Sequence, residues 1–327
     1  MLLREPLLVT LVKLVDTIPM PPEPGKRGRG RPKSYPDRLI IKALVIMVIR
    51  RLYSAYSLLM FLEQETDLTV QLRCLLSEQG QLPSRRTWER RLQALPDQLP
   101  SHIGSLGRHV ATLVQPWLEA GRAAVLDSTP LRAKGGVWHK KDRDKGVVPH
   151  SSIDTTAQWS KSGYHGWWYG FKLHLAATIG SLWIPLAADL TPANVYDAQP
   201  SPALVRELPV AIAYVLGDTH YNDPVLQTTC RLSDRWLIAA RRGSYPHTDP
   251  GVEVRRIFHA LRSQAIEPFN ALFKNVFEWG GQVPVKGFNR VKLIVLGAVF
   301  VYQLVLLYQF HSGRPLGKHI KPLLRAA

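Results

Sequence analysis

The stretch Ala123-Ala-Val-Leu-Asp127 decides the fold that we predict, and Ala211-Ile-Ala-Tyr-Val-Leu-Gly-Asp218 repeats its pattern. Each is a short apolar run that stops at an aspartate. Runs of this kind are typical of buried strands. We therefore expect Asp127 and Asp218 to stand where two strands end, at the edge of one sheet and on rigid elements.

A third carboxylate, Glu267, lies in Ala265-Ile-Glu-Pro-Phe269. Because proline has no amide hydrogen, we expect a helix to start or kink at Pro268, with Glu267 at or near its start. Two strand-borne aspartates and one helix-borne glutamate can hold two Mg²⁺ ions, about 4 Å apart, for in-line attack at phosphorus. The pattern indicates metal-dependent chemistry on phosphates.

Other interpretations of these acids stay open. An aspartate at a strand end is, taken alone, more often a turn or helix cap than a metal ligand. Rival carboxylates lie near the expected ends of other elements, namely Asp154, Asp189, Asp197 and Asp223. Glu278, eleven residues after Glu267, is the alternative third acid.

The order of expected elements predicts the fold class. From residue 123 the patterns indicate a strand, a hairpin of two strands near 171–179 and 182–190, a helix, a strand at 211–216, a helix, a short strand at 236–240 and two further helices. This is the order of the ribonuclease-H-like fold. We predict an α/β protein with a ribonuclease-H-like mixed sheet flanked by helices, preceded by a small helical N-terminal region.

Composition shifts suggest three parts. Residues 1–120 are expected to form a helical DNA-binding region with a basic Pro/Gly-rich linker at 21–36. Within it, helices are expected at 1–20, from Asp37, from about Ser57 and after a Ser84 cap, and Pro96 and Pro100 are expected to end the last of them. Residues 121–312 would form the catalytic domain and 313–327 a basic tail.

Charge and cysteine content bound the partners. The 327 residues hold 42 Lys and Arg against 25 Asp and Glu, a net charge of +17. This excess favours a polyanionic partner, although a basic protein without a special ligand is the plain alternative. Two cysteines without metal-ligand spacing favour a reducing compartment. The apolar run 293–310 contains Gln303 and is better explained as a buried core helix than as a membrane span.

Several cations are candidates for DNA contact. Arg29 and Arg31 lie in Arg29-Gly-Arg-Pro32, which is like an AT-hook core or is merely a basic linker. Arg85, Arg86 and Arg90 surround Trp88 on an expected helix, which either faces DNA or is solvated with Trp88 packed inside. In the long polar segment from Arg132 to Tyr169, the tryptophans and Tyr169 could stack on unpaired bases or pack on the core.

Four motifs together resemble the DDE transposases of bacterial insertion sequences. They are Leu126-Asp-Ser-Thr129, Gly170-Phe-Lys-Leu-His174, Gly217-Asp-Thr-His-Tyr221 and Ile266-Glu-Pro-Phe269 with Lys274. The resemblance implies that Asp127, Asp218 and Glu267 are the catalytic and metal-binding triad. It also implies two Mg²⁺ ions per site, with Mn²⁺ as a possible substitute.

The resemblance further implies partners and an activity. Such proteins cut double-stranded DNA at the terminal inverted repeats of a transposon and join the freed 3′-hydroxyl to target DNA, as homodimers in the DNA complex. We then expect the protein to be cytoplasmic and associated with the nucleoid, with no membrane among its partners. Lys172, in the second motif, is counted with the DNA-binding residues.

One part of the family pattern is shifted. Lys274 has the expected place, seven residues after Glu267 and so on the same helix face. The upstream arginine is Arg262, one position further from Glu267 than expected, with Ser263 at the usual place. We expect Lys274 to contact a phosphate and Arg262 to contribute less. Two other functions stay open: an inactive DNA-binding descendant of a transposase, and a stand-alone Mg²⁺-dependent nuclease.

Overall fold

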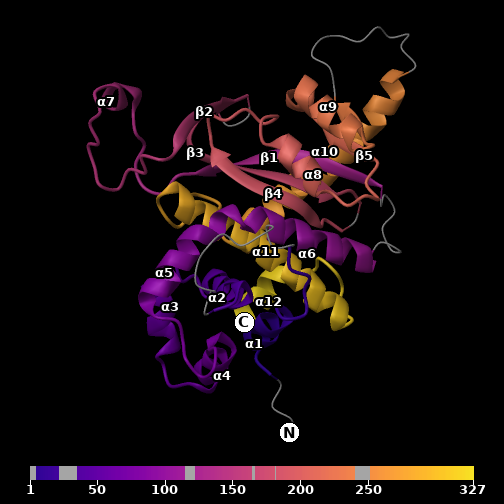
Figure 1. The fold of residues 1–327 in the computed structure, drawn as a ribbon. Helices are drawn as coiled ribbons and strands as arrows, with labels where there is room; N and C mark the ends of the chain where they lie inside the picture. The colour runs from indigo at the N-terminus through magenta and orange to yellow at the C-terminus, as the bar shows by residue number, and fades with distance from the viewer. Residues whose placement is uncertain (1–4, 22–34, 115–121, 164–165, 181, 240–250) are drawn as a thin grey trace, which may run out of the picture.

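A six-stranded mixed sheet forms the centre of the part of the chain that the computed structural model describes, residues 5–21, 35–114, 122–163, 166–180, 182–239 and 251–327 (Figure 1). Its strands are β1 (Ala123–Arg132), β2 (Gln158–Ser162), β3 (Gly166–Thr178), β4 (Pro185–Pro192), β5 (Tyr214–Gly217) and β6 (Trp236–Ala239).

The pairing of these strands confirms the predicted ribonuclease-H-like fold. β1 pairs antiparallel with β3 on one side and parallel with β5 on the other, and β5 pairs parallel with β6. The other edge of the long strand β3 pairs with β2 along its first part and with β4 along its second. An antiparallel hairpin sheet extended by two parallel strands is the arrangement predicted from the order of elements.

Helices surround the sheet. They are α1 (Leu7–Leu14), α2 (Asp37–Ile49), α3 (Ala55–Leu62), α4 (Asp67–Leu76), α5 (Arg85–Ala94), α6 (Leu99–Val114), α7 (Lys140–Asp144), α8 (Ser201–Glu207), α9 (Pro224–Leu232), α10 (Gly251–Val276), α11 (Phe288–His311) and α12 (Ile320–Ala326), with short 3-10 helices η1 (Leu95–Asp97) and η3 (Thr219–Tyr221).

Several expected boundaries are confirmed and others are corrected. Ser84 caps α5, where its hydroxyl accepts a hydrogen bond from the Thr87 amide at 3.3 Å. Contrary to our expectation, Pro100 does not end a helix but lies in the first turn of α6. At that position the missing proline amide costs no hydrogen bond. The segment before Tyr169 also holds α7 and β2, which the polar sequence did not indicate.

The two faces of the sheet carry different groups. Along β1 and β3 the register pairs Asp127 with Leu175 and Leu131 with Phe171, so these side chains share one face. The Phe171 ring contacts Phe288 of α11, which places α11 on that face. Lys172, next to Phe171 in β3, lies on the opposite face, where it bonds Asp197 just before α8.

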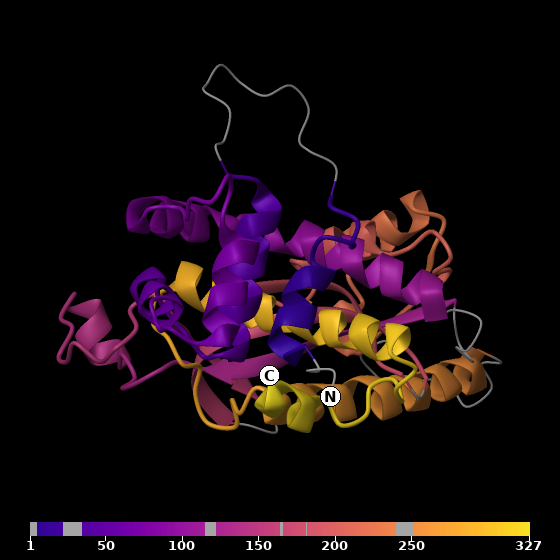
Figure 2. The same cartoon turned by 90° about the horizontal axis from the view of Figure 1, so that it is seen from below.

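Helix α11 is almost wholly buried and packs against both the sheet and the N-terminal helices. In Figures 1 and 2 it runs between the sheet and the N-terminal helices, with α6 beside it. It is long and apolar enough to cross a membrane by composition, with a mean hydropathy of 2.2, but 89% of that window is buried inside the protein. Its buried amide Gln303 donates to the carbonyls of Ile103 and Pro185. The expectation of a buried core helix is confirmed.

The hydrophobic core is continuous across residue 120, where we expected a domain boundary. Residues of α1, α2 and α6 belong to the same buried cluster as the sheet and α11. The C-terminal segment also joins this cluster, because α12 packs beside α10 and buries Ile320. The N-terminal helices are therefore packed on the scaffold that carries the acids.

Candidate active site

Asp127 and Asp218 lie at the seam between the two parallel strands at the centre of the sheet. The register pairs Val125 of β1 with Leu216 of β5, and each aspartate comes two residues later in the chain. Neighbouring strands are about 4.8 Å apart, so this register brings the two aspartates to the same end of the seam. The sequence predicted this proximity from two apolar runs of the same form.

The strand that carries Asp127 does not end there, which corrects the expected exit. β1 continues to Arg132 because β3 pairs with it along this whole length. Only the pairing with β5 stops, after Val125. Asp127 is therefore in the middle of a strand but at the point where that strand loses one neighbour, and it is half-buried.

Asp218 follows β5 directly, as predicted. Its carboxylate caps η3 by accepting the His220 amide at 2.8 Å, and the His220 ring nitrogen lies 3.3 Å from the same oxygen. The turn is tight because Gly217 has no side chain: a Cβ there would lie 2.6 Å from Cβ of Tyr221. The carboxylate is thus held in a fixed turn with 29% of its side chain exposed.

Helix α10 lies over β1 and meets Asp127 through Asn270. The Asn270 side-chain amide donates to Oδ2 of Asp127 at 3.0 Å. Asn270 is only 8% exposed, and its Oδ1 is buried without a hydrogen-bond partner among the described residues. The sequence analysis missed this residue, although its position three after Glu267 is the signal that it shares the helix face of that acid.

Glu267 and Lys274 flank Asn270 on the same stripe of α10. They lie three residues before it and four residues after it, about one turn on either side. Glu267 is exposed. Burial lowers the pKa of Lys274, while the nearby charge of Asp127 opposes that shift.

The helix does not start at Pro268, which corrects one of the two expectations for this proline. α10 runs from Gly251 to Val276, with Pro268 inside it. A proline inside a helix removes one backbone hydrogen bond. The neighbouring buried side chains Ile266, Phe269 and Phe273 pack into the core and hold the helix in place. Glu267 is therefore a residue of the helix interior.

The three acids are not gathered around one point. Among the described residues, no three His, Cys, Asp or Glu side chains lie close enough together to bind a metal ion. The donor set nevertheless suits Mg²⁺, because Asp127, Asp218, Glu267 and the unpartnered Oδ1 of Asn270 all offer oxygen.

The rival acids have structural partners. Asp154 accepts the Thr156 and Gly287 amides, Asp189 pairs with Lys292, Asp197 with Lys172, and Asp223 caps α9. Glu278 lies beyond the end of α10 and pairs with Arg51 and Arg325. Hydrogen bonds from Arg325 and Arg51 lower the pKa of Glu278 to about 2. Its charge is already matched, so it is a poor third acid.

The cations expected at DNA are spread over the molecule. Arg86 and Arg90 are exposed on α5, while Arg85 pairs with Glu89 and lies over the Tyr56 ring. Trp88 is wholly buried, so it packs inside the protein, while the exposed arginines of α5 stay candidates for DNA contact. Lys172 is not brought to the acids. Arg29, Arg31 and the side chain of Arg262 lie outside the described residues.

Comparison with known proteins gives two kinds of match. A family model described as transposase DDE domain matches residues 119–304, more than half of the chain. A piggyBac transposase in a synaptic complex with hairpin DNA is similar at 9% identity and a TM-score of 0.39, covering 98% of this chain and 75% of that chain. Mos1 transposase in a paired-end complex with a left transposon end is similar at 14% identity and a TM-score of 0.22, covering 88% of this chain and 80% of that chain. No curated protein matches.

Proposed function

Because the chain belongs to the transposase DDE domain family, we propose that it is a bacterial insertion-sequence transposase. It cuts DNA at the ends of its element and joins the freed 3′-hydroxyl to target DNA. The observation that carries this proposal to particular residues is the contact between Asn270 and Asp127. That contact holds the helix that carries Glu267 against the strand that carries Asp127, which supports the assignment.

Asp127, Asp218 and Glu267 are the residues that would hold divalent metal, two Mg²⁺ ions or Mn²⁺ in their place. When bound, such ions activate the attacking water or 3′-hydroxyl and stabilise the leaving oxygen. Supporting this assignment are the all-oxygen donor set and the rigid elements that carry it. The aspartates belong to the central strands, and the glutamate belongs to a helix packed on the same core.

The remaining residues position these acids and the DNA. Asn270 fixes the orientation of the Asp127 carboxylate from the helix side, because its amide occupies one carboxylate oxygen. Lys274, one turn further along, carries a positive charge to the same place, where a phosphate beside the cut bond would meet it. The exposed arginines of α5 add a contact to the DNA backbone away from the chemistry.

Double-stranded DNA is the proposed partner, as terminal inverted repeats and as target, with a homodimer in the complex. The net charge of +17 supports a polyanionic partner. Two other functions compete with this proposal. A stand-alone nuclease would use the same acids without joining ends, and an inactive descendant would bind DNA without cutting it.

One assay separates the three functions. The full-length protein is incubated with Mg²⁺, a duplex that carries an end of its own element, and a supercoiled target plasmid. We expect cleavage at the end of the repeat and joining to the plasmid, and neither with a duplex of scrambled end sequence. Cleavage of both duplexes without joining would identify a nuclease. Binding without cleavage in Mg²⁺ and in Mn²⁺ would identify an inactive DNA-binding protein.

A further inference from the structure

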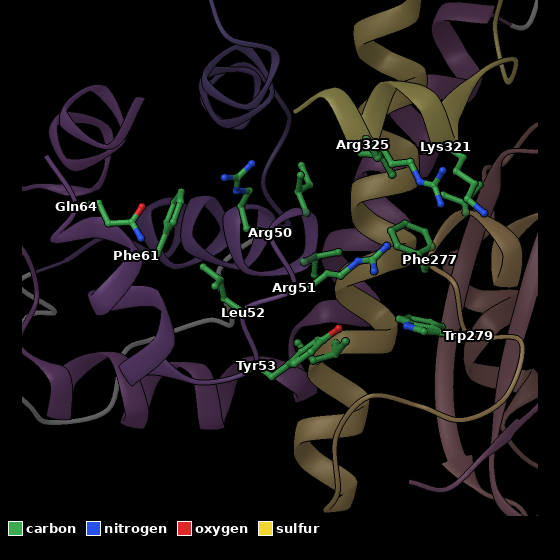
Figure 3. Close-up of a pocket in the computed structure, with 15 residues that line it drawn as sticks. Arg50, Arg51, Leu52, Tyr53, Phe61, Gln64, Phe277, Trp279, Lys321 and Arg325 are labelled. Atoms are coloured by element: carbon green, nitrogen blue, oxygen red, sulfur yellow. The ribbon is translucent and has the colours of Figure 1, made fainter. Parts of the chain in front are cut away.

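A cavity of about 490 Å³ lies away from the acids, where the N-terminal helices meet the C-terminal part of the chain. Figure 3 shows that its walls come from the end of α2 and the loop after it, from α3, from the end of α10 and from α12. This volume is within the range of cavities that hold small organic ligands. Segments far apart in the sequence thus build one site.

The lining of this cavity is strongly basic. Four cations line it, Arg50, Arg51, Lys321 and Arg325, and no acid is among its lining residues. Glu278, an exposed residue outside this lining, pairs with Arg51 at 2.6 Å and Lys321 at 3.7 Å, as well as with Arg325. Arg50 has no carboxylate partner among the described residues. One carboxylate therefore offsets four cations, and the remaining charge attracts an anion.

Aromatic rings complete the lining. Tyr53, Phe61, Phe277 and Trp279 all contribute. Phe277 and Trp279 have ring centroids 5.5 Å apart, and the Arg50 guanidinium lies 5.2 Å from the centre of the Phe61 ring. Cations beside aromatic faces are the combination that binds a nucleotide, since the cations take the phosphate and the rings stack on the base.

The cavity is connected to the candidate active site through α10. Phe277 comes ten residues after Glu267, just past the end of α10, which is about 15 Å along the helix axis and about 80° around it. The Trp279 amide donates to the carbonyl of Lys274 at 2.8 Å, so the last turn of α10 joins the cavity to that lysine. A duplex that runs along α10 would cover this 15 Å with roughly four base pairs, at about 3.4 Å per base pair.

We propose that this cavity binds one nucleotide of the DNA roughly four base pairs from the cut bond, with its phosphate on Arg50 and its base against Phe277 and Trp279. The base must leave the stack of the duplex to reach these rings. The proposal rests on the proposed function, because it takes the DNA at the acids as its reference point. A free nucleotide has the same chemistry, and the experiment separates the two sources.

The experiment uses end duplexes in which 5-iododeoxyuridine replaces one base at a time near the cut. After irradiation of the complex with the full-length protein, cross-linked peptides are identified by mass spectrometry. We expect cross-links to Tyr53, Phe277 or Trp279 from one or two neighbouring positions. Cross-links from every position only to residues elsewhere would overturn the proposal.

Arg50→Gln provides a second readout, since Arg50 is not needed to hold Glu278. We expect it to weaken binding of the end duplex about tenfold and to lower the slope of log affinity against log salt by about 0.9. Arg314→Gln is the matched control, because Arg314 is also exposed and lies 5.6 Å from the Tyr308 ring centre but outside the cavity. Equal affinities for the two variants would contradict the proposal.

A titration with deoxyadenosine monophosphate separates binding of a free nucleotide from binding of a nucleotide that belongs to the DNA. Binding of this nucleotide that depends on Arg50, with no cavity cross-links in the DNA complex, would reassign the site to a free ligand and overturn the proposal. If wild type neither binds nor cuts end duplexes, the proposed function itself fails. If wild type cuts them while Arg50→Gln binds like wild type and the cavity gives no cross-links, the nucleotide site alone fails.

Discussion

Asn270 donates its side-chain amide to the carboxylate of Asp127 at 3.0 Å, and this contact joins helix α10 to the middle of strand β1 across 143 positions of sequence. On α10, Glu267 and Lys274 lie about one turn to either side of Asn270. The contact therefore packs the helix that carries an acid and a cation against the strand that carries Asp127.

Replacing Asn270 should damage activity more than folding. Asn270→Ala removes the amide that orients Asp127, and we expect end cleavage to fall about 10- to 100-fold, as for other residues that orient metal ligands. Asn270→Asp places a second acid beside Asp127 and should shift the pH profile of cleavage upward, because one carboxyl then holds its proton to higher pH. Unchanged rate and pH profile in both variants, with normal thermal unfolding, would exclude this role.

Lys274 should matter more than Arg262. Lys274 lies one turn after Asn270, which contacts Asp127, so Lys274→Ala should impair end cleavage or strand transfer more than Arg262→Ala, with both variants folded. Single-turnover cleavage rates of the two variants compare the positions directly. The reverse order would mean that the helix before Pro268 supplies the phosphate contact.

Because His174 is buried in its neutral form, we expect the protein to lose stability in weak acid. Burial lowers its pKa from 6.5 to about 4, with the charges of Asp197 and Asp189 opposing this and that of Lys172 adding to it. The folded protein keeps the ring neutral, bonded to Thr191 at 2.8 Å, while the unfolded chain takes up a proton below pH 6.5. The contribution of the neutral His174 ring to the free energy of unfolding is complete above pH 6.5 and is lost as the pH falls towards 4.

Urea unfolding of wild type and His174→Gln at pH 7.5 and pH 5 measures this effect. We expect the free energy of unfolding of wild type to fall by about 2 kcal/mol more than that of the variant over this interval, from about 1.4 kcal/mol per pKa unit. Equal losses in the two proteins would show that another group is responsible.

The exposed arginines of α5 should contribute to DNA affinity through charge alone. The double variant Arg86→Gln/Arg90→Gln should reduce the slope of log affinity against log salt by about 1.8, without changing preference for the end sequence. Arg314→Gln/Lys318→Gln removes the same charge elsewhere and is the control. Because the N-terminal helices share the core of the whole chain, the full-length protein is the right material. Identical slopes for the two double variants would remove α5 from the DNA interface.

The sequence predicted the sheet well, because its strands are apolar runs bounded by polar or turn-forming residues. The runs before Asp127 and Asp218, the following hairpin and the buried helix α11 were all recognisable in this way. It predicted the parallel neighbours β1 and β5 only through the known order of the fold. The extent of β1 depends on its pairing with β3, a long-range property that local patterns do not contain.

The errors have related causes. Helix α10 continues through Pro268 because tertiary packing of Phe269 and Phe273 outweighs one missing hydrogen bond. Helix α6 was missed because Pro96 and Pro100 suggested an end, whereas Pro100 lies where a helix tolerates proline. Asn270 was missed because one asparagine on a helix is common, and only its contact with Asp127 gives it a role.

The central claim is that Asp127, Asp218 and Glu267 form one metal-dependent catalytic site. The most direct measurement is the single-turnover rate of end cleavage in Mg²⁺ for Asp127→Asn, Asp218→Asn and Glu267→Gln, beside DNA affinity for the same variants. Asp223→Asn is the matched control, since asparagine can still cap α9. We predict a loss of about a hundredfold or more in each of the three, with DNA affinity retained and the control active. Normal cleavage by any one of the three would contradict the account.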